Sequence, residues 1–499
     1  MDTGTDFPAG LVADPGDRHD DDPGNDPGND PGNDPGDGHG NAAAGQLLVH
    51  AASMAAAYRS TVADQPVRAQ GGPAAIRAGF ELDLQDGKLP AAAVVDELAR
   101  AAAPGLVATA GPRYFGFVIG GSLPAATAAD VLTTGWDQCA YNEVLSPAAA
   151  AAERAAGRWA KDLLGLPEGG SVGFVTGAQA ANTVGIAVGR HRVLADAGWD
   201  VERDGLHGAP RVRVVTSVER HATVDRALRL LGLGAASVET VVADDNGAID
   251  VRDLEAVLAS GHGPAIVCLQ AGNVNTGACD DFAAAIPLAR AAGAWVHVDG
   301  AFGLWAAASP RTRHLTAGVE LADSWGCDAH KWLNVPYDCG LAICADAHAH
   351  AQTVSYTAAY LVGSGSAGDF TLGDLVPESS RRARGFTVWA ALRHLGRDGV
   401  AELVDRSCDL ARRMAQRLAA GGATIHNDVV LNQVLVGFGT DDAHVERVID
   451  GVQRDGTCWL GGTTWRGQRL LRISVSNWST TQADIDRSAD AILRVAASV

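Results

Sequence analysis

Short apolar runs alternate with amphipathic helical segments through the middle of the chain. Runs rich in Val, Ile and other strand-forming residues predict buried β-strands at 171–177, 211–217, 237–243, 265–272, 294–300, 322–328 and 340–346. Between these runs the spacing of apolar positions predicts helices, for example over 179–198 and 221–232. Strands that alternate with helices are typical of an α/β fold with a mostly parallel sheet.

Helical patterns flank this alternating region on both sides. Residues 45–63 and 91–103 precede it and predict packing or subunit-interface helices. After it, a long helical pattern from residue 386 is followed by two strand patterns within 430–477, which predicts a smaller C-terminal α+β domain. We therefore expect four parts, which cover residues 1–41, 42–110, 111–385 and 386–499.

The first part has a composition of its own, because the tetrapeptide Asp-Pro-Gly-Asn repeats in it. Residues 1–40 hold eleven Asp and one Arg, with no Glu or Lys, and so contribute −10 to the formal net charge of −20. Pro and Gly interrupt regular structure and the segment has little to bury, so residues 1–41 are predicted to be a disordered acidic tail. Aspartate oxygens could bind calcium, but their spacing lacks the ligand pattern of a known calcium loop.

The composition excludes several classes of protein. No apolar run reaches the roughly 18 residues of a membrane span, and the N-terminus lacks the basic and apolar regions of a secretory signal, so we expect a cytoplasmic protein without a membrane partner. Eight cysteines without a C-x-x-C pair fit reduced thiols better than a disulfide framework or a zinc site. No basic cluster suggests nucleic acid, and the turn at 232–237 lacks the third glycine of a dinucleotide-binding motif.

Lysine is rare in this chain, and one lysine has unusual surroundings. Of 39 Lys and Arg residues only Lys88, Lys161 and Lys331 are lysines. Lys88 stands in a polar, turn-like stretch and Lys161 on the polar face of a predicted helix. Lys331 follows a histidine in the apolar stretch GCDAHKWLNVPYDCG. Because an apolar site favours the neutral amine, Lys331 is a candidate nucleophile of the kind that forms a Schiff base.

Polar residues also stand where other predicted strands end. Asp299 ends one apolar strand, and His221 stands between another strand and a helix. Asp299 could equally be a helix N-cap or a metal ligand, and His221 could be only a capping or surface histidine. Ligands of α/β sheets, however, bind beyond the carboxyl ends of the strands. The same location holds possible backbone phosphate donors at Gly177, Ala178 and Gln179 and hydrogen-bonding side chains at Asn273, Asn275 and Thr276. A phosphate cradle, an acid, an aromatic ring and a lysine together are what pyridoxal phosphate requires.

The segments around these residues resemble the group II pyridoxal-phosphate-dependent decarboxylases, which include aromatic-L-amino-acid and glutamate decarboxylases. HVDGAFG at 297–303 is similar to the H-V-D-A-A motif of that family, and DAHKWLNVPYDCG at 328–340 to its N-x-H-K-W segment. Residues 111–132 and 142–167 resemble its substrate-side and S-P-x(n)-E segments. The resemblance spans roughly residues 45–499 and implies the fold of type I pyridoxal-phosphate-dependent transferases, with a large cofactor-binding domain and a small one.

The resemblance also implies roles for individual residues. Lys331 would form the Schiff base, His330 would contact the phosphate, and Asp299 would pair with the pyridinium nitrogen. Ala301 would lie beneath the ring and His221 would stack on its face. Further cofactor contacts are expected from Gly177, Ala178, Gln179, Asn273 and Thr276. Substrate contacts are expected from Tyr114, Phe115 and Arg472, of which Arg472 could hold a carboxylate bidentately.

One segment departs from the family pattern. In the aromatic-amino-acid members a mobile loop before R-R-x-R carries a tyrosine that protonates the α-carbon, whereas residues 363–386 of this chain contain no tyrosine. Phe370 and Thr371 lie near the expected place, and Tyr356 and Tyr360 lie upstream of it. Without that acid, His221 or water could supply the proton, or the reaction could end in an aldehyde.

Three readings of the function follow. The first is a carboxy-lyase that converts an L-amino acid into an amine and CO2. The second is other pyridoxal-phosphate chemistry, either transamination or aldehyde-forming oxidative deamination. The third is a non-catalytic member that binds cofactor or a partner chain, against which Lys331 and Asp299 argue. By resemblance we expect a homodimer with the site near the subunit boundary, and no metal ion.

Overall fold

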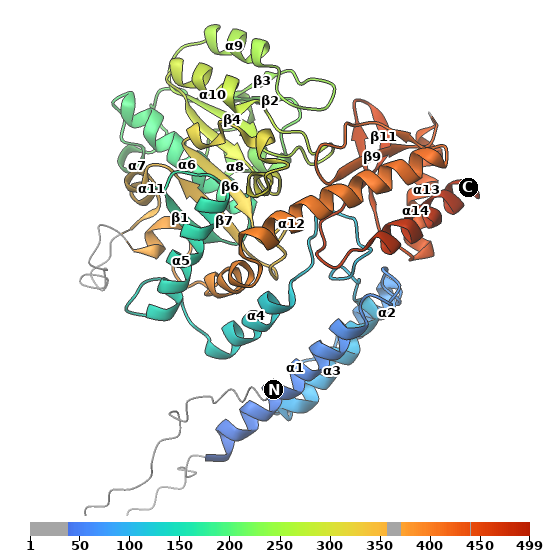
Figure 1. The fold of residues 1–499 in the computed structure, drawn as a ribbon. Helices are drawn as coiled ribbons and strands as arrows, with labels where there is room; N and C mark the ends of the chain where they lie inside the picture. Colours follow the sequence, from blue (N-terminus) through green and yellow to red (C-terminus); the bar gives the residue numbers. More distant parts are fainter. Residues whose placement is uncertain (1–37, 357–370, 440) are drawn as a thin grey trace, which may run out of the picture. The chain divides into compact units, whose positions relative to one another are not determined.

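The computed structural model describes residues 38–356, 371–439 and 441–499 (Figure 1). Residues 50–499 form one compact unit, and the described part of residues 1–49 is the first half of helix α1 (Gly38–Thr61). Residues 1–37 of the predicted tail lie outside the described residues, whereas residues 38–41 already belong to α1. Among the described helices, none has the length and apolar character needed to span a membrane.

The seven strands predicted in the alternating region form one sheet with the order β1-β7-β6-β5-β4-β2-β3. They are β1 Ser171–Val175, β2 Arg213–Ser217, β3 Val238–Val241, β4 Ala265–Gln270, β5 Trp295–Asp299, β6 Ser324–Asp328 and β7 Gly340–Cys344. Strands β3, β2, β4, β5 and β6 pair in parallel, whereas β7 is antiparallel to β6 and β1. Every strand except β7 therefore runs in one direction, which confirms the predicted, mostly parallel α/β sheet.

Both faces of this sheet are buried. In β2, Val215 belongs to one apolar core and Val214 to another, and Val267 and Ile266 of β4 are divided in the same way. Because successive side chains of a strand point to opposite faces, helices must cover both sides of the sheet. Helix α6 (Ala178–Asp196) packs on β5, β6 and β7 and covers the face that holds Val214 and Ile266.

The remaining helices of this region surround the sheet. They are α4 (Pro124–Trp136), α5 (Pro147–Leu163), α7 (Val201–Asp204), α8 (Ala222–Leu230), α9 (Val251–Ala259), α10 (Phe282–Ala291) and α11 (Ala347–Val354). Helix α6 also contacts α8, whose first turn follows β2. This contact brings the polar residues at the start of α8 beside the start of α6.

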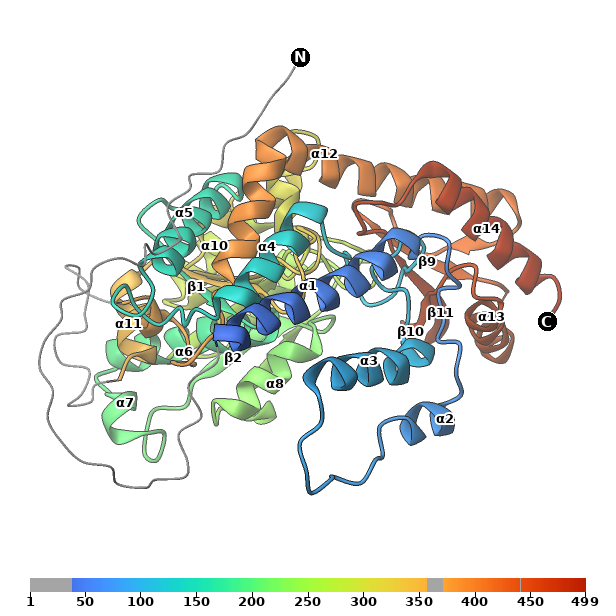
Figure 2. The same cartoon turned by 90° about the horizontal axis from the view of Figure 1, so that it is seen from below.

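The C-terminal region forms a second, antiparallel sheet with the order β10-β11-β9-β8. Its strands are β8 Thr424–Ile425, β9 Gln433–Gly437, β10 Gly461–Trp465 and β11 Gln468–Ser474. Strands β8 and β10 were not predicted, since β8 is two residues long and β10, with the sequence GGTTW, lacks apolar alternation. Helices α13 (Asp442–Asp455) and α14 (Gln482–Ala496) pack against each other beside this sheet (Figure 2).

One long helix connects the two sheets. Helix α12 (Gly385–Ala420) contains the long helical pattern predicted from residue 386, and its backbone leaves helical geometry at Gly396, where φ is 62° (Figure 1). A positive φ suits glycine, which has no Cβ to clash with the following carbonyl. The break lets one chain segment pack first beside α4 and α5 and then beside β9 and α14.

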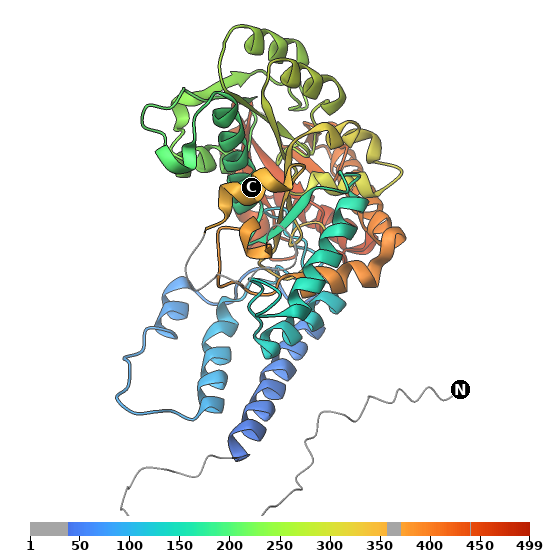
Figure 3. The same cartoon turned by 90° about the vertical axis from the view of Figure 1, so that its left-hand side faces the viewer.

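Helices α2 (Pro73–Ala78) and α3 (Ala91–Ala102) extend away from the large sheet together with the segment between them (Figure 3). Neither helix contains a buried residue. Leu84 before α3 and Val94 and Leu98 within it are exposed large apolar side chains. Exposed apolar side chains gathered on one element mark an interaction surface.

Three arginines before α12 fix the path of the chain into this helix. Arg381 pairs with Glu153 of α5 through two hydrogen bonds of 2.6 and 2.8 Å, and each side chain is only 1% exposed. Arg382 pairs with Asp130 of α4 and Arg384 with Asp338, which follows β6. Because buried charges need a paired, hydrogen-bonded partner, the Arg381–Glu153 pair holds this junction in one arrangement.

Removing Arg381 should destabilise the fold strongly. The substitution Arg381→Met leaves the buried Glu153 carboxylate unpaired, and we expect the free energy of unfolding to fall by about 3–5 kcal/mol. Urea denaturation followed by circular dichroism measures this change. Arg397→Met is the matched control, because Arg397 pairs with Asp162 at side-chain exposures of 64% and 55% and its loss should cost at most about 1 kcal/mol. Equal losses in both variants would contradict the role of burial.

Stability should also depend on pH through His350 of α11. This side chain is fully buried against Ser171, and burial lowers its pKa to about 4, whereas an unfolded histidine titrates near 6.5. Between pH 6.5 and 4 only the unfolded chain takes up this proton, so stability should fall by about 3 kcal/mol as the pH falls through that window. Urea denaturation at several pH values should show a flatter dependence for His350→Gln, while His394→Gln at an exposed position keeps the wild-type slope. Parallel curves for His350→Gln and the wild type would refute the assignment.

Candidate active site

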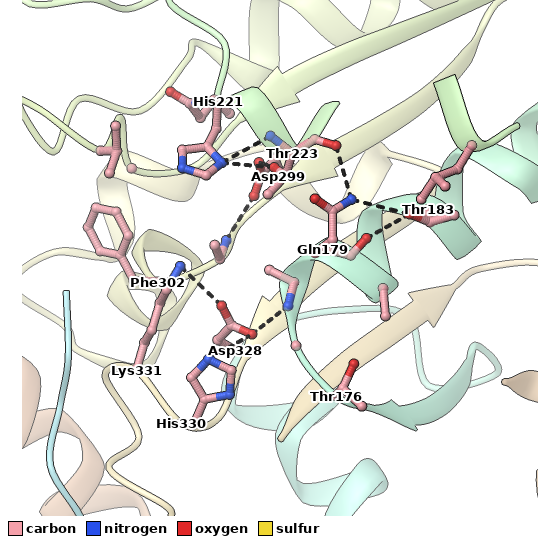
Figure 4. Close-up of a pocket in the computed structure, with 18 of the residues that line it drawn as sticks. Thr176, Gln179, Thr183, His221, Thr223, Asp299, Phe302, Asp328, His330 and Lys331 are labelled. Carbon is pink, nitrogen blue, oxygen red and sulfur yellow. Dashed lines mark hydrogen bonds and ion pairs between the residues drawn. The ribbon is translucent and has the colours of Figure 1, made fainter. Parts of the chain in front are cut away.

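A cavity of about 510 Å³ lies at the edge of the large sheet where the carboxyl ends of its strands meet (Figure 4). Nineteen residues line it, and most of them come from the ends of β1, β4, β5 and β6 and from the starts of α6 and α8; Leu230 ends α8, and Pro377 precedes α12. The cavity includes the predicted site residues Gly177, Ala178, Gln179, His221, Asp299, Ala301, His330 and Lys331. Segments more than 150 residues apart in the sequence thus meet in one pocket, as expected for ligand sites of parallel sheets.

Lys331 lies in the turn after β6, and its amine is paired with an acid. Its Nζ atom lies 3.1 Å from Oδ2 of Asp328, the last residue of β6 (Figure 4). Oδ1 of the same carboxylate accepts a hydrogen bond of 2.5 Å from the backbone N–H of Ala178. The expectation of an apolar environment for Lys331 is therefore wrong, because Asp328 holds the ammonium group in place. Asp328 stands where the resembling segment of the family has the asparagine of N-x-H-K-W.

His330 faces the same carboxylate from the other side. The backbone N–H of Cys339 donates a hydrogen bond of 3.1 Å to its Nδ1 atom, so in the neutral ring the proton is on Nε2. Nε2 lies 3.6 Å from Oδ1 of Asp328, and the ring packs at 4.5 Å from that of Tyr337. Burial lowers the pKa of His330, which keeps the ring neutral. His330 can therefore present an N–H donor beside the start of α6.

Asp299 occupies the end of β5 and is 4% exposed. Its Oδ1 accepts a hydrogen bond of 3.2 Å from the backbone N–H of Ala301, and its Oδ2 lies 3.4 Å from Oγ1 of Thr223. A buried carboxylate needs a cation or several donors, and one backbone N–H with a long contact to the Thr223 hydroxyl leaves capacity for a charged partner in the cavity. Asp299 is thus available to a protonated ring nitrogen.

His221 is the N-cap residue of α8. Its Nδ1 atom lies 2.9 Å from Oγ1 of Thr223 and accepts a 3.3 Å hydrogen bond from the backbone N–H of the same residue (Figure 4). The pKa of His221 is lowered, mainly by burial, and nearby Asp299 opposes this shift whereas the charges of Lys331 and Arg472 add to it. The ring is therefore neutral and held at a fixed orientation beside the cavity.

The start of α6 supplies backbone donors and a close approach. Gly177 is its N-cap residue, and a Cβ atom there would lie 3.0 Å from Cε1 of His330. The Gln179 side chain donates to the carbonyl of Thr223 at 3.2 Å, and its Oε1 is buried without a hydrogen-bond partner among the described residues. Free amide groups at a helix N-terminus favour an anion such as a phosphate.

Two predicted cofactor residues have a different place in the structure. Asn273 and Thr276 are buried in the turn after β4 and do not line the cavity. The side chain of Asn273 donates to the carbonyl of Glu219 at 3.1 Å, and the hydroxyl of Thr276 donates to the carbonyl of Asn246 at 2.6 Å. These hydrogen bonds hold the turn after β4 to the neighbouring turns. The two side chains therefore support the shape of the cavity wall and do not line the cavity themselves.

The predicted substrate residues also differ among themselves. Phe115 is 1% exposed and belongs to the apolar core of the C-terminal region, so its position argues against a direct contact with substrate. Tyr114 is stacked on Trp459 with ring centroids 4.8 Å apart, and burial raises its pKa to about 12. Phe117, which sequence reasoning did not single out, also stacks on Trp459, with ring centroids 5.3 Å apart, and is 60% exposed. Its positive φ of 54° is a local irregularity that could not be read from the sequence.

Arg472 of β11 is the only predicted substrate residue with a charge. Burial lowers the pKa of its guanidinium, and its charge acts on His221, which places the two within electrostatic reach. In the described part of the chain no carboxylate forms an ion pair with Arg472. An unpaired, largely desolvated guanidinium is suited to bind an anionic ligand.

The tyrosines near the expected loop do not reach the cavity in the described part of the chain. The Tyr356 hydroxyl lies 2.6 Å from Oγ of Ser379, and Tyr356 is not among the lining residues. Thr371 forms a capping box with Asp374 at the start of a short 3₁₀ helix, Leu372–Leu375. Phe370 and Tyr360 lie outside the described residues.

The residues gathered in the cavity fit pyridoxal phosphate. An amine for its aldehyde (Lys331) and an acid for its ring nitrogen (Asp299) line one pocket, with an imidazole (His221) and a small residue (Ala301) beside them. The N–H of Ala178 is already taken by Asp328, so the other amide groups of the first turn of α6 and a neutral His330 are the available donors for the phosphate group. Two further residues line the cavity, the Thr223 hydroxyl and the Asp328 carboxylate, which accepts from Ala178 and pairs with Lys331. Sequence reasoning passed over both, although the Asp in D-A-H-K marks a departure from the family motif.

Comparison with known proteins agrees with this chemistry. The family model described as the pyridoxal-dependent decarboxylase conserved domain matches residues 73–438. Tryptophan decarboxylase 1 of Oryza sativa subsp. japonica is 28% identical over 416 residues, which cover 76% of this chain and 79% of the relative. Phenylacetaldehyde synthase of Arabidopsis thaliana is 26% identical over 373 residues, with 72% and 75% of the two chains covered.

The fold is also that of a solved member. The crystal structure of Oryza sativa TDC with PLP and tryptamine superposes with a TM-score of 0.85 at 22% identity and covers 94% of this chain and 99% of that chain. At this identity the likeness establishes the fold. Because the family model spans most of the chain and the cavity holds the matching groups, this chain belongs to the pyridoxal-dependent decarboxylase family and its cofactor is pyridoxal phosphate.

Proposed function

We propose that this enzyme decarboxylates an L-amino acid to the corresponding amine and CO2. The observation that carries the proposal is that Lys331, Asp299 and His221 line one cavity. Arg472 is not among the lining residues, but its charge acts on His221, and it has no acidic partner among the described residues. A decarboxylase needs to hold a substrate carboxylate near an electron-accepting group, and these residues provide both functions.

The residues of the cavity each have a role in this proposal. When bound, pyridoxal phosphate supplies an electron sink conjugated to the substrate α-carbon. Lys331 holds the cofactor covalently, and Asp328 keeps the lysine amine in position before the cofactor enters. Asp299 would stabilise a proton on the ring nitrogen, and His221 and Ala301, which line the same cavity, would contact the ring. The start of α6 and His330 hold the phosphate.

Arg472 is proposed to bind a carboxylate of the substrate. The guanidinium lies on β11 of the C-terminal sheet, so substrate would bind between elements of both sheets. A planar guanidinium can donate two parallel hydrogen bonds to a carboxylate, which fixes its orientation as well as its position. The aromatic side chains of Tyr114, Phe117 and Trp459 stack near the same C-terminal region and offer an apolar surface for a side chain of the substrate.

Aldehyde formation or transamination is the second candidate. Residues 371–386 contain no tyrosine, and Tyr356 donates to or accepts from Ser379 instead of lining the cavity. A proton donor for the α-carbon is therefore absent from the cavity in the described residues, apart from His221 and Lys331. The similarity to a phenylacetaldehyde synthase is consistent with an aldehyde as the product.

We further propose that the enzyme is a cytoplasmic homodimer. Helix α3 buries none of its own residues and exposes Val94 and Leu98, which a second copy of the chain would cover. The eight cysteines are all free, and thiols without disulfides are typical of a reducing compartment. The four parts predicted from the sequence remain the proposed division of the chain, except that residues 38–41 belong to α1.

The covalent link to the cofactor can be tested directly. Borohydride reduction of the holoenzyme followed by peptide mass spectrometry should find the pyridoxal adduct on Lys331, and Lys331→Ala should lose both the adduct and the visible absorbance of the bound cofactor. Lys161→Ala is the control, because Lys161 lies on α5 and its amine bonds to the carbonyls of Glu168 and Gly170. An adduct that persists in Lys331→Ala would exclude the assignment.

The reaction itself is tested by products. Purified holoenzyme with a panel of L-amino acids should release CO2 and an equal amount of amine, and Arg472→Gln should raise KM by about 10- to 100-fold for the best substrate because a charge-assisted carboxylate contact is lost. Arg469→Gln on the same strand is the control, since Arg469 pairs with Glu446 at an exposed site. Aldehyde with hydrogen peroxide and ammonia would support the second candidate, and a keto acid without CO2 would exclude decarboxylation.

A further inference from the structure

A chain of buried hydrogen bonds runs beneath the cavity, on the face of the large sheet that α6 covers. It begins at Trp295 of β5, whose Nε1 donates a 3.0 Å hydrogen bond to Oγ of Ser324 on β6. Oγ of Ser324 lies 2.9 Å from Nδ1 of His297, and Nε2 of His297 lies 3.1 Å from Oδ1 of Asn182. Ser324, His297 and Asn182 have no exposed surface.

This series of hydrogen bonds continues from Asn182 to the cavity. Nδ2 of Asn182 donates a 3.1 Å hydrogen bond to Oγ1 of Thr223, which in turn lies 2.9 Å from Nδ1 of His221. Side chains from two strands, α6 and α8 thus connect the indole of Trp295 to the imidazole that lines the cofactor cavity.

The indole N–H of Trp295 determines which group donates in each of these hydrogen bonds. An indole N–H can only donate, so Ser324 accepts from Trp295 and its own hydroxyl proton is left for His297. If Nδ1 of His297 carried a proton instead, the Ser324 hydroxyl would have no acceptor among its described neighbours, at a cost that buried groups avoid. The proton of His297 is therefore on Nε2, where it is donated to Oδ1 of Asn182.

The remaining steps follow in the same direction. Because Oδ1 of Asn182 accepts from His297, its amide N–H group points to Thr223, and Oγ1 of Thr223 is an acceptor there. The hydroxyl proton of Thr223 then goes to Nδ1 of His221 at 2.9 Å and not to Asp299 at 3.4 Å. The backbone N–H of Thr223 also donates to this nitrogen, so Nδ1 of His221 is an acceptor from two sides.

Close packing prevents the hydrogen-bonded side chains from adopting another arrangement. A Cβ atom at Gly185 of α6 would collide with Nδ1 of His297, and one at Gly326 of β6 would collide with Oδ1 of Asn182. Two glycines therefore make the space in which His297 and Asn182 fit without alternative positions. Burial also lowers the pKa of His297 to about 4, so the ring remains neutral and keeps one donor and one acceptor nitrogen.

We infer that Trp295, Ser324, His297, Asn182 and Thr223 are positioning residues that hold His221 in the tautomer with its proton on Nε2. His221 then presents an N–H group, and no lone pair, to the cavity. In Figure 4 one ring nitrogen of His221 is directed at Thr223 and the other points away from it. The residue is therefore built as a hydrogen-bond donor toward a ligand and not as a general base. The inference rests on the proposed function for the identity of that ligand.

The tautomer can be read without any reaction. Long-range 1H–15N correlation spectra of the full chain with 15N-labelled histidine distinguish protonated from unprotonated ring nitrogens, and His221→Gln and His297→Gln assign the signals by their loss. In the wild type, without and with added pyridoxal phosphate, both His221 and His297 should carry the proton on Nε2. A proton on Nδ1 of His221 would overturn the inference.

Two variants test whether the buried hydrogen bonds determine the tautomer of His221. Asn182→Asp keeps the shape but replaces the donor to Thr223 with an acceptor, so the Thr223 hydroxyl turns toward residue 182 and the His221 ratio of Nε2–H to Nδ1–H should fall roughly 2- to 12-fold, as expected for one neutral hydrogen bond. Thr223→Val removes the hydroxyl without a buried charge and should shift the ratio in the same direction. An unchanged ratio in both variants would overturn the inference.

Ser171→Ala is the matched control, because Ser171 is a buried serine that contacts a different buried histidine, His350, at 2.8 Å. The control should leave the His221 ratio at its wild-type value, and an equal shift there would also overturn the inference. Failure of the proposed function is distinguishable, since it would appear as a missing cofactor adduct while the tautomer measured without cofactor stayed on Nε2.

Discussion

The common direction of six strands in the large sheet is the constraint on which the rest of this structure depends. Because β1 to β6 all run the same way, the segments that follow β1, β2, β5 and β6 emerge at one edge and bring Gly177, His221, Asp299 and Lys331 into a single cavity. A strand of opposite direction would carry its polar terminus to the far edge. Strand β7 shows this, since its carboxyl end contributes no residue that lines the cavity.

Burial of both faces of that sheet imposes a second requirement. Polar side chains buried in and around the sheet must have partners. The structure meets this with oriented contacts: Glu153 with Arg381, Lys331 with Asp328, and His297 between Ser324 and Asn182. These contacts do not contribute large net stability by themselves. Their effect is to allow few alternative arrangements of protons and side chains around the cavity, which is what a site that depends on one orientation of its groups requires.

The parts of the site that were predictable are those in which local sequence and topology coincide. Asp299 and Lys331 stand directly after buried strands, so their position at the sheet edge followed from the strand pattern and from the H-V-D and H-K-W segments. Asn273 and Thr276 also follow a strand, but the turn after β4 folds back on itself and uses both side chains for its own hydrogen bonds. Phe115 was equally ambiguous, because an aromatic side chain beside a predicted site can pack into a core, as it does here.

The sequence by itself determined the α/β class, the seven strands, the lysine and aspartate of the site and the cofactor, because each depends on residue type and on spacing within a few residues. Only the tertiary structure decided which groups surround them. The pairing of Lys331 with Asp328 depends on how the turn after β6 bends, and the contacts of His221 with Thr223 and Asn182 depend on how α6 and α8 pack. The long α12, with its break at Gly396, likewise follows from packing against two sheets. Interactions between residues distant in the chain carry no local pattern, so they exist only once the chain has folded.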